Sequence, residues 1–154
     1  SYAIHIISTD TIARYWRVDM YDTTNSDGYV QVGRLFMGPA WQPDYNAEVG
    51  LNMGWETSTQ MQKALSGTRY YQRRVPYIVT NFSLNVMSVD EAMQNAFEID
   101  RMAGIDKEVF YIFSPDDTLH ALRRRYMGTL RQLSPLEYPT ANLLKKSYSI
   151  EEVV

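Results

Sequence analysis

The sequence contains no cysteine, so neither a disulfide framework nor a thiolate metal site can form. No apolar run approaches the roughly 18 residues that a membrane-spanning helix needs, and the first residues lack the order of a signal peptide. The net charge of -3 gives the chain as a whole no attraction to nucleic acid or to an anionic membrane. We therefore expect a soluble chain that does not insert into membranes.

Motifs for catalysis and metal binding are also missing. His5 and His120 are the only histidines, and neither stands at metal-ligand or catalytic spacing from another candidate residue. The acidic pairs at 116–117 and 151–152 are adjacent in sequence, so their carboxylates diverge on a turn or strand, whereas acid–base catalysis needs convergent ones. We expect structural or surface histidines, no catalytic residues, no metal site and no cofactor.

Residues 22–28 resemble a calcium loop in composition only. Asp22, Asn25 and Asp27 offer oxygen atoms ahead of Gly28, but the spacing of an EF-hand and its distal bidentate glutamate are absent. Asp, Asn and Gly are also the residues that favour turns. The segment therefore predicts the turn of a hairpin, with strands at 14–21 and 29–36.

The clearest local pattern begins at Ile78 and ends at Gly104. Alternate residues from 78 to 86 predict a strand with one face on a core. From Ser88 the apolar spacing becomes helical, and Ser88 with Glu91 forms the pattern of a capping box, in which each bonds the other's free amide. Gly104 can end the helix in a left-handed conformation. The expected apolar face of this helix consists of Val89, Ala92, Met93, Ala96, Phe97 and Ala103.

The remaining segments are mostly strand-like. An alternating segment at 45–55 contains Gly50 and Gly54, which predict the close approach of a partner chain or sheet. Residues 2–7 are expected to form an edge strand or part of an N-terminal arm within 1–12. Residues 57–67 are expected to form a helical turn or a loop. Further strands are expected at 68–75, 109–113, 123–133 and 148–153, with a helical turn at 119–122 and a loop bounded by Ser134-Pro135 and Tyr138-Pro139.

Together these segments predict one domain, residues 1–154, that is mainly β. Twelve tyrosines and three tryptophans suit pleated surfaces and protein interfaces. About eight strands with a single good helix favour an antiparallel β-sandwich or barrel with one flanking α-helix at about 89–103 over an alternating α/β sheet.

Two arginine clusters and one tryptophan are candidates for contacts. Consecutive arginines on a strand point to opposite faces, so the clusters at 73–74 and 123–125 favour pairing with carboxylates of the same or an adjacent subunit over phosphate binding. Trp41, on a proline-fenced loop, is either a lid over the core or an interface anchor. The candidate interface residues are Trp41, Tyr45, Gly50, Gly54, Arg73, Arg74, Arg123 and Arg125.

The order of the segments resembles a known class of proteins. The strands followed by RRVPYIVTNFSLNVMSVDEAMQNAFEIDRMAG, then EVFYIFSPDD, RRRYMGTLRQL and YSIEEV, are similar to the tail-tube and distal-tail proteins of long-tailed bacteriophages. The similarity covers roughly residues 68–154. It implies a β-sandwich with one flanking helix, six copies of which close into a ring around the DNA channel.

This resemblance implies a virion structural protein of a phage tail, near the distal end or baseplate or in a tube-like ring. Its partners would be further copies of itself, as a hexamer, and other tail proteins, and DNA would pass through without specific binding. Assembly would take place in the host cytoplasm, before incorporation into the virion.

A second resemblance supports an alternative. The segment ARYWRVDMYDTTNSDGYVQVGRLFMG is similar to a strand pair of discoidin-like, galactose-binding sandwich domains. It implies a carbohydrate-binding module in which Trp16, Trp41 or Trp55 stacks on a sugar ring. The central helix departs from that pattern, because such a domain does not usually insert one.

Overall fold

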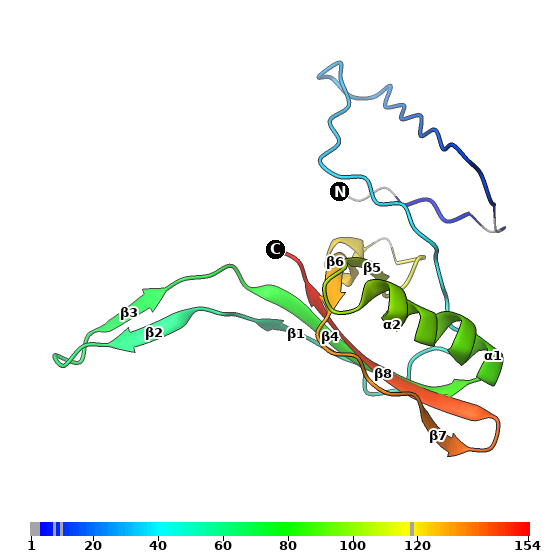
Figure 1. Ribbon diagram of the computed structural model, residues 1–154. Coiled ribbons are helices and arrows are strands. Elements are labelled where there is room, and N and C mark those ends of the chain that lie inside the picture. The colour runs from blue at the N-terminus through cyan, green and yellow to red at the C-terminus, as the bar shows by residue number, and fades with distance from the viewer. Residues whose placement is uncertain (1–3, 8, 10, 118) are drawn as a thin grey trace. The chain divides into compact units, whose positions relative to one another are not determined.

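The computed structural model describes residues 4–7, 9, 11–117 and 119–154, and the chain divides into two compact units. The first ends at Ala40 and the second comprises Trp41–Val154. All regular secondary structure in the described residues belongs to the second unit. Figure 1 shows its strands and helices in chain order.

The first unit forms the predicted turn without the predicted strands. Asp22 Oδ1 accepts a hydrogen bond from the Thr24 amide at 3.2 Å, and the Asn25 side-chain amide donates to the Tyr29 carbonyl at 2.7 Å. The described residues before Trp41 contain no strand, so the strands expected at 14–21 and 29–36 were wrong. Alternation orders the side chains, but a strand also needs a hydrogen-bonding neighbour.

The N-terminal prediction lies only partly within the described residues. Residues 4–7 are not a strand. Residues 2 and 3 of the expected edge strand, and residues 1–3, 8 and 10 of the expected arm at 1–12, lie outside the described residues.

The second unit is built on antiparallel strands. Five strands follow the order β1-β4-β8-β6-β5, β7 pairs with β8, and β2 and β3 form a separate two-stranded sheet. The bounds are β1 Asn52–Glu56, β2 Gln60–Lys63, β3 Arg69–Gln72, β4 Tyr77–Met87, β5 Val109–Ile112, β6 Arg125–Leu130, β7 Glu137–Thr140 and β8 Leu143–Glu152. The prediction of a mainly β, antiparallel fold with about eight strands is confirmed. The barrel form is excluded, because the end strands β1 and β5 do not pair.

The predicted helix is confirmed over its whole length. It consists of α1 Val89–Glu91, a π-helical turn η1 Ala92–Ala96 and α2 Phe97–Ala103. Ser88 Oγ accepts from the Glu91 amide at 3.1 Å, and Gly104 ends the helix with a φ of 55°. The second half of the capping box is replaced, because the Glu91 carboxylate turns inward and accepts from Trp41 and the Asp44 amide.

Only part of the predicted helix face is buried. Ala92, Ala96 and Ala103 are buried, whereas Met93 is 44% exposed and Phe97 is 56% exposed. Alanine side chains are short, so they let the helix lie close to the sheet. The larger side chains of the expected face therefore stay outside the contact.

The alternation of β4 fails near its end. Val86, expected in the core, is 40% exposed, whereas Met87, expected on the polar face, is fully buried. The pairing of β4 with β8 shifts register between Leu84 and Met87. A bulge inserts one residue and so exchanges the two faces of the strand beyond it.

Several predicted boundaries were also wrong. Residues 45–51 are not a strand, because the chain turns at Gly50, which has a φ of 125°. Residues 60–63, expected in a helical turn or loop, form β2. The expected loop at 134–139 overlaps β7, an edge strand in which Pro139 does not need to donate a ladder hydrogen bond. The expected helical turn near 119–122 is α3, Ala121–Arg124, so the strand predicted from residue 123 begins at Arg125.

One face of the sheet carries the core. From residue 144 to residue 151, β8 alternates between buried and half-buried positions, with Leu144, Lys146, Tyr148 and Ile150 pointing inward. Tyr148 stacks with Phe82 at a centroid distance of 5.4 Å. The helix lies over β4 and β8 on this face (Figure 1). The other face is mostly polar, as expected of an antiparallel sheet with one solvated side, although Val79 on that face of β4 is buried.

A buried charge joins the helix to the sheet. Lys146 is 1% exposed, and its ammonium donates to the Ala96 carbonyl at 3.2 Å and forms an ion pair with Asp100. The same group lies 5.2 Å from the centre of the Tyr148 ring. Burial and the nearby Asp100 raise the pKa of Tyr148, so its hydroxyl stays protonated and can donate to the same carbonyl.

We expect Lys146→Ala to lower the free energy of unfolding by about 3–5 kcal/mol, because it leaves the largely buried Asp100 without its partner. The double variant Lys146→Met/Asp100→Leu should recover most of that loss, since a hydrophobic pair of similar volume needs no charge compensation. Urea denaturation of both variants measures the difference. Equal losses of stability in the single and the double variant would contradict the importance of the ion pair between Lys146 and Asp100.

Gly128 provides a second test of the sheet. A Cβ at this position would lie 2.6 Å from the Glu151 carbonyl oxygen and 2.7 Å from Ile150 Cγ2. We therefore expect Gly128→Ala to destabilise the protein by about 1–3 kcal/mol in urea denaturation. Gly54→Ala is the matched control, because no atom lies within 4 Å of its Cβ position, and it should leave stability nearly unchanged.

Candidate assembly surface

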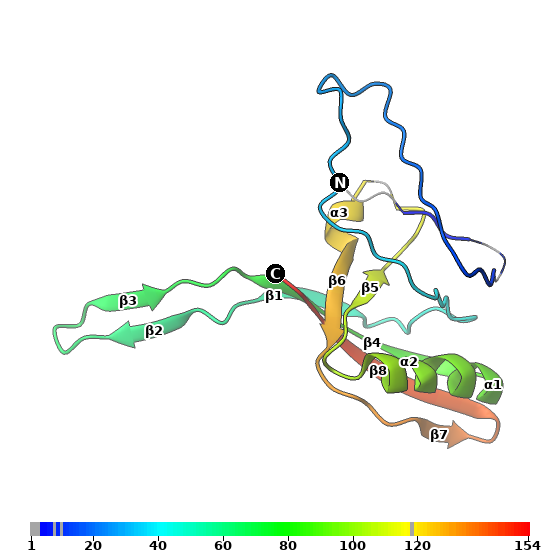
Figure 2. The ribbon, with the colours of Figure 1, turned by 45° about the horizontal axis from the view of Figure 1, so that its top comes forward.

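An exposed element of the second unit is a two-stranded ribbon, which we define as residues 57–76. It contains β2 and β3, paired from Gln60↔Gln72 to Lys63↔Arg69. Figures 1 and 2 show that it continues the β1–β4 pair outward, beyond the end of the sheet. Every residue of both strands is exposed. Isolated two-stranded hairpins are marginally stable in water, so a ribbon of this kind is suited to a partner.

The base of the ribbon is irregular. Three residues, 57–59, separate β1 from β2, whereas four residues, 73–76, separate β3 from β4. The Thr59 hydroxyl bridges the gap, accepting from the Arg74 amide at 2.9 Å. Pro76 lies on the longer side, where it has no amide to offer. Arg73 and Arg74, two of the predicted interface residues, therefore stand at the base of the ribbon and are exposed.

The two faces of the ribbon differ in chemistry. Residues paired directly across an antiparallel ladder share a face, so Met61, Lys63, Arg69 and Tyr71 lie together on what we call the basic face. Gln60, Gln62, Tyr70 and Gln72 form the opposite, uncharged face. The basic face thus combines two cations with two large apolar groups.

The ribbon also differs in charge from the rest of the chain. It contains Lys63, Arg69, Arg73 and Arg74 and no acidic residue, which gives it a charge of +4. This leaves 11 basic against 18 acidic residues, a net charge of -7, elsewhere in the sequence. A cationic projection on an anionic body favours contacts between unlike surfaces.

Trp41 and Tyr45 lie apart from the ribbon. The indole N–H of Trp41 donates to Glu91 Oε1 at 3.3 Å, and its ring meets the edge of Tyr148 at 6.5 Å between centroids. These contacts favour the lid interpretation of Trp41 over the interface anchor. Tyr45 is exposed, four residues further along the same loop.

The two predicted glycine positions are open. At both Gly50 and Gly54 a Cβ would meet no atom of the described chain within 4 Å. The expected approach of a sheet of the same chain is therefore not found among the described residues. The approach of a partner chain to these glycines stays a prediction.

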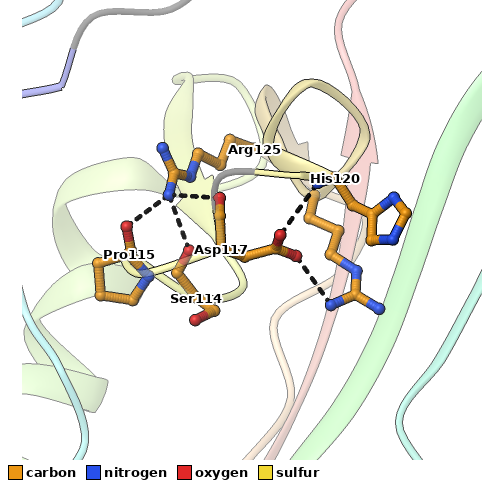
Figure 3. A network of polar contacts seen from close by, with 6 residues as sticks. Ser114, Pro115, Asp117, His120 and Arg125 are labelled. Atoms are coloured by element: carbon orange, nitrogen blue, oxygen red, sulfur yellow. Dashed lines mark hydrogen bonds and ion pairs between the residues drawn. The ribbon is translucent and has the colours of Figure 1, made fainter.

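The second arginine cluster stabilises a loop of its own chain (Figure 3). Arg125 Nη2 donates to the carbonyls of Ser114, Pro115 and Asp117 at 3.1, 2.5 and 2.9 Å. Arg124 Nη1 bonds the Asp117 carboxylate at 3.0 Å, as expected for pairing within the subunit. Arg123 is exposed on α3. Arg123 and Arg125 are thus separated from the ribbon along the chain, and a role for them in subunit contacts stays a prediction.

The described residues contain no group of three or more His, Asp or Glu side chains that could hold a metal ion. The acidic pair at 151–152 serves the fold, since Glu151 bonds Arg131 and Glu152 accepts from the Ile78 amide. The polar face of the sheet has an open hollow, lined in part by Asn52, Asn81, Ser83 and Ser147. Among the described helices, none has both the length and the apolar character to cross a bilayer.

Sequence reasoning predicted β3, within the strand expected at 68–75, and the residues at the base of the ribbon, but it missed β2. The residue types at 57–67 did not distinguish a strand from a turn, because glutamines and small polar residues carry little periodicity. The absence of any acid between residues 57 and 76 was the available signal. No family model matches the chain, and the comparison with curated proteins finds no match.

The loop around Asp117 has a testable pH dependence. The backbone amide of His120 and the Arg124 guanidinium hold the pKa of the Asp117 carboxyl below its usual value of 3.8. A carboxylate with a lowered folded-state pKa stabilises the fold above its unfolded pKa, and this contribution is lost as pH falls through the folded value. We expect Asp117→Asn to lower stability at neutral pH and to flatten its decline below pH 3.8.

Urea midpoints measured between neutral and acidic pH provide this test. Asp116→Asn is the matched control, because it removes the neighbouring carboxylate without touching the bonds to His120 and Arg124. If the stability of Asp117→Asn fell at acidic pH as steeply as that of the wild type, the assignment of this pH dependence to the Asp117 carboxylate would be contradicted.

Proposed function

We propose that the protein is a structural subunit of a phage tail, in a distal-tail, baseplate or tube-like ring, whose copies assemble around the DNA channel. The observation that carries this proposal is the exposed ribbon. It buries none of its own strand residues in the second unit, yet it presents large side chains on both faces. Such an element is better explained by contact with a further chain than by stabilisation of its own fold.

The edges of the sheet support the same function. β1 and β5 end the strand order, so each has an edge without a neighbouring strand among the described residues. An unpaired edge is a template for pairing with another chain. An assembly of copies would cover such edges without the need for a reactive cleft.

The charge distribution suits a conduit. With the ribbon engaged in contacts, the remaining net negative charge would repel the phosphate backbone and let DNA pass without specific binding. By the resemblance of residues 68–154, the assembly would be a ring of six copies in the virion tail, formed in the host cytoplasm and joined there by other tail proteins.

Oligomeric state tests the proposal directly. Native mass spectrometry and electron microscopy of the full chain should reveal a discrete closed oligomer whose population rises with protein concentration. A variant in which an Asn-Gly turn replaces residues 60–72 should remain folded by circular dichroism but lose that oligomer, because it lacks the ribbon strands. A single-copy species at every concentration, with or without the ribbon, would refute the proposal.

A further inference from the structure

The helix carries an exposed apolar surface that the fold does not use. Val89, Met93 and Phe97 follow one another at intervals of four residues, and all three are exposed. We call these three residues the helix ridge. Residues at this spacing share one side of a helix, so they form a continuous stripe. The ridge remains outside because the buried alanines make the contact with the sheet.

One exposed carboxylate lies beside the ridge. Asp90 is exposed in the first turn, next to Val89, and forms no ion pair within the described part of the chain. The other carboxylates of the helix are engaged in its own fold, since Glu91 accepts from Trp41 and the Asp44 amide, Glu98 is paired with Arg101, and Asp100 is paired with Lys146. The ridge therefore combines apolar side chains with one carboxylate, Asp90, that is open to a cation of a partner.

The basic face of the ribbon has the complementary composition. Met61 lies opposite Tyr71, and one position further along that face Lys63 lies opposite Arg69. Like charges directly across a ladder destabilise it, and within the described part of the chain neither cation has an ion-pair partner. An anionic partner would remove this repulsion.

We propose that the basic face of the ribbon in one copy docks on the helix ridge of a second copy. Met61 and Tyr71 would pack against Met93 and Phe97, with the cations beside Asp90. This inference rests on the proposed self-assembly and names its contact. A second copy is required because the ribbon and the helix extend in different directions from the sheet of the second unit (Figures 1 and 2).

Nucleic acid is a weaker occupant of the ribbon. The net charge of -7 outside the ribbon would repel a polyanion, and DNA binding would leave the helix ridge exposed. Docking between copies covers both surfaces at once. Because it joins two different surfaces, the contact is heterologous and produces rings or open helical arrays.

A pair of variants with equal charge change tests the face that docks. Lys63→Gln/Arg69→Gln and Gln60→Glu/Gln62→Glu both lower the net charge by two, the first on the basic face and the second on the opposite face of the ribbon. We expect the first to weaken self-association about tenfold or more in sedimentation experiments, and the second to have a much smaller effect. Adding Asp90→Lys to Lys63→Glu/Arg69→Glu should restore association.

The absence of cysteine makes a second test specific. A Met61→Cys chain mixed with a Met93→Cys chain should form an intermolecular disulfide under mild oxidation, whereas Gln60→Cys mixed with Met93→Cys should not. Circular dichroism confirms that each variant is folded.

The outcomes separate the two proposals. A wild-type chain that never self-associates would refute both of them. A wild-type oligomer that tolerates the Lys63 and Arg69 substitutions and fails to crosslink would overturn only the docking contact. A 20-base-pair DNA duplex that binds the wild-type chain more tightly than the chain binds itself, with binding lost in Lys63→Gln/Arg69→Gln, would assign the ribbon to nucleic acid.

Discussion

The ammonium of Lys146 fixes where the helix lies on the sheet. A buried charge costs several kcal/mol unless it is paired, and here the Ala96 carbonyl, the Asp100 carboxylate and the face of Tyr148 all surround it. The helix cannot slide or rotate without leaving this charge unpaired. Because a buried ion pair adds little net stability, its main contribution is to select one position of the helix. That position turns the alanines inward and the helix ridge outward.

The segment from Ile78 to Gly104 was predictable because its signals are local. The change from a period of two to helical spacing, the cap at Ser88 and the glycine at 104 each depend on neighbours in sequence. The errors within it come from distant partners. The bulge in β4 depends on its register with β8, and the inward turn of Glu91 depends on Trp41 and Asp44.

Sequence reasoning missed the residues whose role depends on tertiary contacts. Lys146 follows the inward alternation of Leu144, Tyr148 and Ile150, but a lysine at such a position is normally taken as solvated. Arg125 bonds three carbonyls, and no composition rule connects it to residues 114–117. The strands expected before Trp41 failed for the opposite reason, because their pattern was sound and a neighbouring strand was lacking.

The separation of charge along the chain constrains the assembly that we propose. The ribbon and the helix ridge are different surfaces, so a contact between them would have a direction, and each copy would both give and receive one. Whether successive copies close into a ring would then depend on the angle between the ribbon and the helix. Lys146 holds the helix on the sheet, and the β1–β4 pair of the same sheet carries the ribbon. One sheet therefore fixes the directions of both elements. In the proposed ring, the rigidity of the sheet would therefore decide the number of copies, and the charges on the ribbon would decide how strongly the copies associate.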